Sequence, residues 1–367
     1  MIGKISFEYT NTQPLPIKTQ ENKRELSLYT VKNQELAGFS GIDALKASVL
    51  CTISFKGCGG GYLSQNIQAK ADDTKLWSFS VRQDEKPTIG RIVVKGNWSG
   101  KPELAKKLLE ETCNNWPKGQ KVEFLIGCGG LAQFDWPKNI PVGKEYKNSM
   151  QDKQNGIKYF EELTQNAEKV VKAQILTPEV VKKLSKITDF ISFGIDSASN
   201  KNGELNEPHA ELVCFVDLEN NKYHWTGKSY PWAPQIKGLI KAPLESHFID
   251  NINGKNITIL GCNDLVVFHP RSKSEASIPW RVDLLSGIRK LTSKHKPDIV
   301  LQHPHTTDTH NTWYLAWKEL VKDFPTVKAY ASSGKYYNDE GHERASLEKV
   351  LENTKEGNSV DMILSLN

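Results

Sequence analysis

Three imidazoles and a carboxylate follow one another within eight residues near the end of the chain, at His303, His305, Asp308 and His310. In an extended or turning segment, His303 and His305 project to the same side, a spacing suited to one metal ion. Asp308 or His310 would complete three protein ligands and leave a coordination position open for water. The alternative is that these are loop histidines in ordinary polar contacts.

Two carboxylates follow apolar runs that have the composition of strands. Asp264 comes after the run 257–260, and Asp196 comes after Phe193-Gly-Ile. Open α/β sheets place their active groups at the carboxyl ends of strands, so we expect Asp264, and next Asp196, to join the histidines as metal ligands. The alternative for Asp264 is that it caps a turn.

Other reactive side chains have weaker patterns around them. Lys228 lies between a glycine and a serine, as in phosphate contacts, but the spacing of a P-loop is absent. Cys58 and Cys128 each lie in a Gly-Cys-Gly-Gly turn, where a thiol can be exposed, but no histidine in their half of the chain could activate them. Trp313 and Trp317 are four residues apart, which predicts one buried helix face rather than base stacking.

Composition restricts where such chemistry can take place. All nine histidines lie after residue 208, so any imidazole chemistry belongs to the second half. The chain has no signal-like N-terminal segment and no apolar run long enough to cross a bilayer, which predicts a cytoplasmic protein with six reduced cysteines and no membrane partner. A net charge of +5 permits an anionic ligand without the basic stripe of a dedicated DNA-binding protein. No pattern indicates an oligomeric state.

The elements that must position these residues alternate between strands and helices. A polar stretch at 137–156 predicts a linker, and we divide the chain there into an N-terminal α/β region, 1–150, and a C-terminal α/β domain, 151–367, that carries all the histidines. In the first region the patterns predict a helix from Pro102 and strands at 48–55, 76–81, 89–94 and 122–126.

The second half begins with helical patterns and continues into strands. We expect helices at 160–174, from Pro178, at 280–294 and at 312–322, with strands at 190–195, 210–217, 222–226, 257–260, 298–301 and 327–331. Strand and helix alternation of this kind predicts an α/β fold with mixed β-sheets flanked by helices.

Residues 200–367 resemble the end of a metallo-β-lactamase-fold domain of the competence-protein type. In that family a strand runs into a His-His-Gly-Ser loop, a helix follows, and the next strand leads to Ser-x-Gly-x-x-Asn and a later histidine. Here a strand runs into His303-Pro-His305, and Ala-Ser-Ser-Gly334-Lys-Tyr-Tyr-Asn338 precedes His342. The run that ends in Asp264 is similar to the strand whose aspartate bridges two metals.

The resemblance implies a layered αββα architecture, but the main metal motif of the family, His-x-His-x-Asp-His, has no counterpart in this chain. A standard dinuclear zinc centre therefore cannot be assembled from this chain. Three alternatives remain: a site for a single metal ion, a metal site at another place in the fold, or an inactive fold that is retained for ligand binding. A second resemblance, to calcineurin-like phosphoesterases, has Gly261-Cys-Asn-Asp264 and Gln302-His-Pro-His305 in the family's order, and it also lacks the leading motifs.

These observations together predict a metal-dependent hydrolase, a phosphodiesterase acting on a nucleotide or nucleic acid. Its ligands for Zn or Mn would be His303, His305 and Asp264, with His310 and Asp196 as further ligands. His342 would contact the substrate, and Asp264, His303 and His305 would also act in catalysis. The alternative function is a catalytically degenerate metallo-hydrolase fold that serves as a binding or defence-type module for an anionic ligand.

Overall fold

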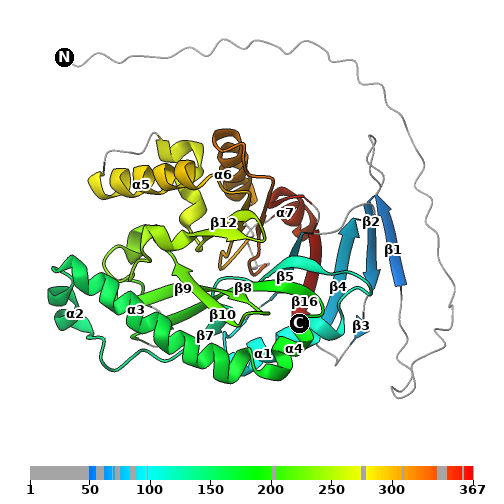
Figure 1. Ribbon diagram of the computed structural model, residues 1–367, viewed down its shortest axis with the longest axis horizontal. Helices are drawn as coiled ribbons and strands as arrows, with labels where there is room; N and C mark the ends of the chain where they lie inside the picture. The colour runs from blue at the N-terminus through cyan, green and yellow to red at the C-terminus, as the bar shows by residue number, and fades with distance from the viewer. Residues whose placement is uncertain are drawn as a thin grey trace, which may run out of the picture. The chain divides into compact units, whose positions relative to one another are not determined.

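Apolar residues in period-two alternation build two β-sheets in the computed structural model (Figure 1). The structure describes residues 49–54, 62–67, 69–70, 75–82, 88–96, 98–200, 204–273, 278–307, 310–336, 345–357 and 359–366. No helix among these residues combines the length and the apolar character that crossing a bilayer requires.

The larger sheet is mixed and has eleven strands within the described residues. Its order along the main path is β1 (Val49–Ser54), β2 (Tyr62–Ile67), β4 (Lys75–Arg82), β16 (Ser359–Leu366), β5 (Ile89–Lys95), β6 (Val122–Ile126), β8 (Thr188–Ala198), β9 (His209–Asp217) and β10 (Lys222–Gly227). The short strands β3 (Ala69–Lys70) and β7 (Ala132–Gln133) pair with β4 and β8. The pairs β16–β5, β5–β6 and β6–β8 are parallel. The pairs β8–β9 and β9–β10 are antiparallel.

The smaller sheet has a parallel centre. Its order is β11 (Phe248–Ile252), β12 (Lys255–Leu260), β13 (Ile299–Gln302), β14 (Ala329–Ser332) and β15 (Lys355–Glu356), and β12, β13 and β14 run parallel. Apolar side chains of both sheets form one buried cluster, to which Phe124 and Phe215 come from the larger sheet and Ile259 and Leu301 from the smaller. The two sheets are therefore packed face to face.

Helices cover the outer face of each sheet (Figure 1). On the larger sheet lie α1 (Pro102–Asn114), α2 (Gly143–Ser149), α3 (Lys153–Val170) with its π-helical continuation Val171–Ile175, and α4 (Pro178–Leu184). On the smaller sheet lie α5 (Pro279–His295) and α6 (His310–Asp323). The helix α7 (Leu347–Asn353) packs with Val93 and Tyr336. The prediction of mixed sheets flanked by helices is confirmed.

Strands from both sides of residue 150 belong to the larger sheet, because β6 pairs with β8 and β5 pairs with β16. The polar stretch 137–156 contains α2, and the side chain of Tyr146 in that helix is buried and donates to the carbonyl of Gly238. The division at 150 stays a prediction. Limited proteolysis tests it, since a linker would be cleaved between 137 and 156 first.

Candidate functional site

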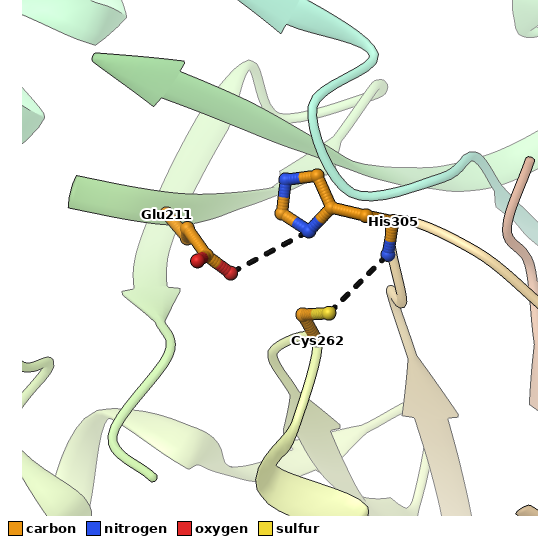
Figure 2. A group of neighbouring side chains, drawn as sticks. All are labelled: Glu211, Cys262 and His305. Carbon is orange, nitrogen blue, oxygen red and sulfur yellow. Dashed lines mark hydrogen bonds and ion pairs between the residues drawn. The ribbon is translucent and has the colours of Figure 1, made fainter. Parts of the chain in front are cut away.

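The carboxyl ends of several strands converge on one group of polar side chains, Glu211, Lys228, Cys262 and His305. Cys262 follows β12, His305 follows β13, and Lys228 follows β10, while Glu211 lies near the start of the antiparallel β9. Figure 2 shows the Glu211 carboxylate directed at the His305 ring and the Cys262 sulfur directed at the His305 backbone. A carboxylate oxygen, the sulfur and a ring nitrogen of these three residues lie within 4.8 Å of one another.

His305 links three of its neighbours. Its Nε2 lies 2.7 Å from Oδ2 of Asp196, its Nδ1 lies 3.5 Å from Oε2 of Glu211, and its backbone N–H donates to Sγ of Cys262 at 3.4 Å. Burial lowers the pKa of His305, but the two carboxylates outweigh burial and raise this pKa well above its usual range. The ring is therefore an imidazolium at neutral pH, with an N–H on each nitrogen.

Lys228 and Glu211 form a buried ion pair next to this imidazolium. Nζ of Lys228 donates to Oε1 of Glu211 at 3.0 Å and to Oε1 of Gln235 at 2.6 Å, and the side-chain amide of Gln235 also donates to Glu211. Burial opposes both charges, yet their mutual attraction raises the pKa of Lys228 and, together with His305, lowers the pKa of Glu211. Both side chains are charged at neutral pH.

Cys262 is fixed by the turn in which it lies. A Cβ on Gly261 would lie 2.8 Å from the backbone N and Cα of Lys228, so only glycine allows the Cys262 turn to approach the Lys228 turn this closely. The side-chain amide of Gln302 donates to the carbonyl of Cys262 at 2.9 Å. The thiol is partly exposed, and the charges of Lys228 and His305 act on it.

The other three cysteines whose side chains the structure describes are in different surroundings. Burial raises the pKa of Cys113 and of Cys128 to about 11, and it raises the pKa of Cys214 well above its usual range. Cys128 and Cys214 are fully buried. These three residues are therefore unreactive thiols at neutral pH, because the thiolate is the nucleophilic form of cysteine. Cys58 lies outside the described residues.

Asp264 does not face the open part of the site. It is fully buried, its Oδ1 accepts the backbone N–H groups of Ser229 and Tyr230 at 2.9 and 2.7 Å, and its Oδ2 accepts that of Gly261 at 2.9 Å. The carboxylate thus ties the turn of Cys262 to the segment that follows Lys228. Burial raises the pKa of Asp264, while His247 and the N–H donors oppose that rise.

His303 is a buried histidine with both ring nitrogens engaged. Its Nδ1–H donates to the carbonyl of Gly127 at 2.8 Å, and its Nε2 accepts the hydroxyl of Ser192 at 3.0 Å. Burial lowers its pKa to about 4, although the Gly127 carbonyl opposes this shift, so the ring is neutral. His303 therefore fastens its loop to the Gly-Cys-Gly-Gly turn at 127–130.

The remaining predicted site residues are distributed as follows. Asp196, at the end of β8, joins the group through His305, whereas His310 is the first residue of α6. Asp308 and His342 lie outside the described residues. The structure thus brings together His305 and Asp196 of the predicted set and adds Glu211, Lys228 and Cys262. Trp313 and Trp317 are buried in the core beside the smaller sheet, as predicted.

The distances among Glu211, Cys262 and His305 would admit a metal ion, but the charges at the site oppose one. Metal ligands must offer a free lone pair, and an imidazolium has none. The ammonium of Lys228 occupies Oε1 of Glu211 and would repel a second cation. The arrangement suits a thiol nucleophile between two cationic side chains better than a divalent metal.

Comparisons with known proteins give structural likeness only. No model of a protein family matches the chain, and no curated protein matches it. Among solved structures, an amidase from Nesterenkonia sp. is similar at 11% identity over 70% of this chain and 78% of that one, with a TM-score of 0.35. A variant of that amidase with an acetamide moiety on its active-site cysteine has 12% identity, the same coverages and a TM-score of 0.38.

These findings correct the predicted family and function. The similar structures named above are forms of one amidase, and two further variants of that amidase are described as belonging to the nitrilase superfamily. The predicted resemblance to metallo-β-lactamase-fold proteins is therefore wrong. The same finding contradicts both predicted functions, the metal-dependent phosphodiesterase and the degenerate metallo-hydrolase that binds an anionic ligand. The physical reason lies in the two strongest predicted ligands, since the ring nitrogens of His303 and the oxygens of Asp264 are already used in holding the loops.

Proposed function

We propose that this protein is a thiol-dependent acyl hydrolase in which Cys262 attacks the carbonyl carbon of an amide or ester. One observation carries the proposal: the Cys262 sulfur accepts the backbone N–H of His305 and lies within 4.8 Å of ring and carboxylate atoms of His305 and Glu211. A cation-flanked, partly exposed thiol at the end of a strand is the setting of a nucleophilic cysteine. The proposal rests on this geometry alone.

In the acylation step, the thiolate of Cys262 forms a bond to the carbonyl carbon. The imidazolium of His305 gives a proton to the leaving nitrogen or oxygen as the bond from carbon to that atom breaks. The products are a thioester on Cys262, a neutral His305 and a free amine or alcohol. Asp196 is placed to orient the ring throughout, because it accepts from Nε2 at 2.7 Å and leaves Nδ1 for the proton transfer.

In the deacylation step, the neutral His305 takes a proton from water while the water oxygen attacks the thioester carbon. The thiolate of Cys262 leaves, the carboxylic acid departs, and the imidazolium is restored. Lys228 stays charged through both steps because Glu211 and Gln235 hold its ammonium. Its positive charge stabilises the negative charge that returns to the sulfur as the thiolate leaves.

Acyl-enzyme trapping tests this proposal. With p-nitrophenyl acetate as the acyl donor, we expect one acetyl group on Cys262 by peptide mass spectrometry, as a thioester that hydroxylamine removes. Cys262→Ala should form no thioester, and Cys113→Ala should form it as the wild type does, because Cys113 is a partly exposed thiol outside the site. A thioester that persists in Cys262→Ala, or none in the wild type, contradicts the proposal.

A cytoplasmic location is part of the same proposal. The four cysteines whose side chains the structure describes are free, and a nucleophilic thiol is kept free in a reducing compartment. Fractionation of cells that express the chain, with the thiol state of Cys262 measured by alkylation, tests the location.

A further inference from the structure

A pocket of about 670 Å³ lies between α2, the start of α3 and the segment 236–243. It is separate from the cavity of about 1090 Å³ that opens beside Glu211 and His305, because the two share no lining residue. Its volume is in the range of pockets that bury a small-molecule ligand. Nothing in the proposed hydrolysis uses this pocket.

Apolar side chains from each of these elements line the pocket. Met150 follows α2, Ile157 belongs to α3, and Ile236 and Leu239 belong to the segment 236–243. Ile157 is 51% exposed and Ile236 is 40% exposed, so each leaves a large part of its hydrocarbon surface in water. A single exposed isoleucine is ordinary, but two that meet at one pocket from separate elements indicate a surface that a hydrocarbon chain covers.

The charged side chains of this lining that the structure describes are all lysines. They are Lys147, Lys237 and Lys241, and no carboxylate is among the described residues that line the pocket. Lys147 pairs with Glu207 at 3.6 Å, whereas no carboxylate in the described part of the chain forms an ion pair with Lys237 or Lys241. Tyr146 also lines the pocket and adds no negative charge, since burial raises its pKa to about 12.

Lys241 is the cation of this pocket that is best placed to bind an anion. Its surroundings partly remove the ammonium from water, which lowers its pKa, and no carboxylate within the described ranges opposes this shift. Its Nζ lies 5.0 Å from the centre of the Trp280 ring, a contact that leaves the net charge in place. An anion beside Lys241 would restore the interactions that the ammonium loses with water.

We infer that the pocket binds an amphiphilic anion, a straight aliphatic chain that ends in one carboxylate. The carboxylate pairs with Lys241 and Lys237, and the chain covers Ile157 and Ile236. A neutral chain would leave the two ammonium groups unpaired, and a cation would be repelled by them. A net charge of +5 also permits an anionic ligand. The inference does not rest on the proposed chemistry of Cys262.

NMR of isotope-labelled methionine methyl groups tests the inference at the pocket itself. The chain has three methionines, of which Met150 lines the pocket and Met362 is fully buried in the core. We would titrate the protein with octanoate, octanol and octylammonium, with Met150→Leu to assign the signal. We expect octanoate to shift the Met150 signal with about tenfold higher affinity than octanol, as one charge-assisted contact provides, and octylammonium to bind most weakly. The Met362 signal should not move.

Four variants locate the two parts of the ligand. Lys241→Gln should weaken octanoate binding about two- to fivefold and leave octanol binding unchanged, the effect of a charge pair near the surface. Lys186→Gln removes an exposed lysine outside the pocket and should change neither affinity. Ile157→Ser should weaken both ligands about fourfold, the effect of one buried methylene group. Leu315→Ser, at a similarly exposed residue of α6, should weaken neither.

Three results would overturn the inference: equal affinities for octanoate and octanol, a Met150 signal that no ligand moves, or an octanoate affinity that Lys241→Gln leaves unchanged. None of these measurements involves Cys262. They therefore decide the inference whether or not the proposed thioester forms, and the failure of one proposal does not imply the failure of the other.

Discussion

Nε2 of His305 lies 2.7 Å from Oδ2 of Asp196, and this pair joins the two sheets at the site. Asp196 belongs to β8 of the larger sheet, and His305 follows β13 of the smaller sheet. A Cβ on Gly130 would lie 2.7 Å from the same Asp196 oxygen, so the glycine turn at 127–130 leaves room for the pair. The contact fixes which ring nitrogen of His305 is directed toward Glu211 and the sulfur.

Asp196→Asn should slow acyl transfer on the order of a hundredfold or more in kcat/KM, because a histidine that loses its orienting carboxylate acts in the wrong tautomer or position. The carboxylate also raises the pKa of His305, so its removal lowers that pKa. The imidazolium then deprotonates at lower pH, and the alkaline limb of the kcat/KM profile should move to lower pH. Rates with p-nitrophenyl acetate across a pH series measure both effects.

Asp189→Asn is the matched control, since Asp189 lies on the same strand but forms an exposed ion pair with Lys121 at 2.7 Å. Its kcat/KM and its alkaline limb should match those of the wild type. An Asp196→Asn profile that also matches the wild type would exclude His305 as the proton donor.

Lys228→Met should destabilise the protein by about 3–5 kcal/mol, because it leaves the charge of Glu211 buried without its ammonium partner. Lys183→Met removes the partner of Glu110 in a more exposed pair at 3.5 Å, and should cost at most about 1 kcal/mol. Urea unfolding of both variants gives the comparison. A Lys228→Met variant as stable as Lys183→Met would mean that Glu211 takes up a proton in the folded state.

His303 and His305 should respond to pH in opposite directions although they are two residues apart. Burial lowers the pKa of His303 from 6.5 to about 4, so between these values the unfolded chain binds a proton that the folded chain does not. Stability then falls as pH decreases from 6.5 to 4, by about 3 kcal/mol for this one ring. The raised pKa of His305 has the other sign: its stabilisation is complete below 6.5 and is lost only as pH rises through the folded-state pKa.

Urea unfolding of the wild type and of His303→Gln between pH 4.5 and 6.5 measures the first effect as a difference in slope. If the variant does not fold, NMR of ring-labelled wild type gives the same information, since the His303 ring should stay neutral at pH 5. A His303 ring that is protonated at pH 5 contradicts the prediction.

The local pattern of apolar and polar residues was sufficient to predict most of the helices and strands. The strands β6, β8, β9, β10 and β12 and the helices α1, α5 and α6 lie where apolar periodicity and a first-turn proline or flanking glycine predict them. The strand β16 was missed because its place between β4 and β5 depends on pairing partners about 270 residues away in the chain. The short strands β7 and β15 are likewise set by their neighbours rather than by their own residues.

The site was harder to predict because its chemistry depends on which loops meet. Asp264 and His303 were expected as ligands from their position after strands, but position alone does not show that backbone N–H groups and a carbonyl already occupy them. No pattern pointed to Cys262, although it lies two residues before Asp264, and the residues around Lys228 suggested only a phosphate contact. Glu211 lies near the start of a strand, where the rule that active groups follow strand ends does not apply. A carboxylate, a lysine and a cysteine, each near one end of a strand, were the signal that could have identified this group.

Asp264→Asn is the change for which the metal prediction and the structure expect opposite results. A metal ligand would be lost with little effect on folding, whereas the carboxylate seen here accepts three backbone N–H groups while fully buried. An asparagine keeps one acceptor oxygen and places an NH₂ group against a backbone donor, so we expect a loss of about 1–3 kcal/mol in the free energy of unfolding. Asp217→Asn, which alters an exposed turn contact to Asn220, should change that free energy by less than about 0.5 kcal/mol.

Because Asp264 also holds the Gly261 turn, the Asp264→Asn variant should shift the rate at which iodoacetamide alkylates Cys262, and Asp217→Asn should not. Urea unfolding and the alkylation rate together decide the matter: an Asp264→Asn variant with wild-type stability and wild-type Cys262 reactivity would show that the turn does not depend on this carboxylate.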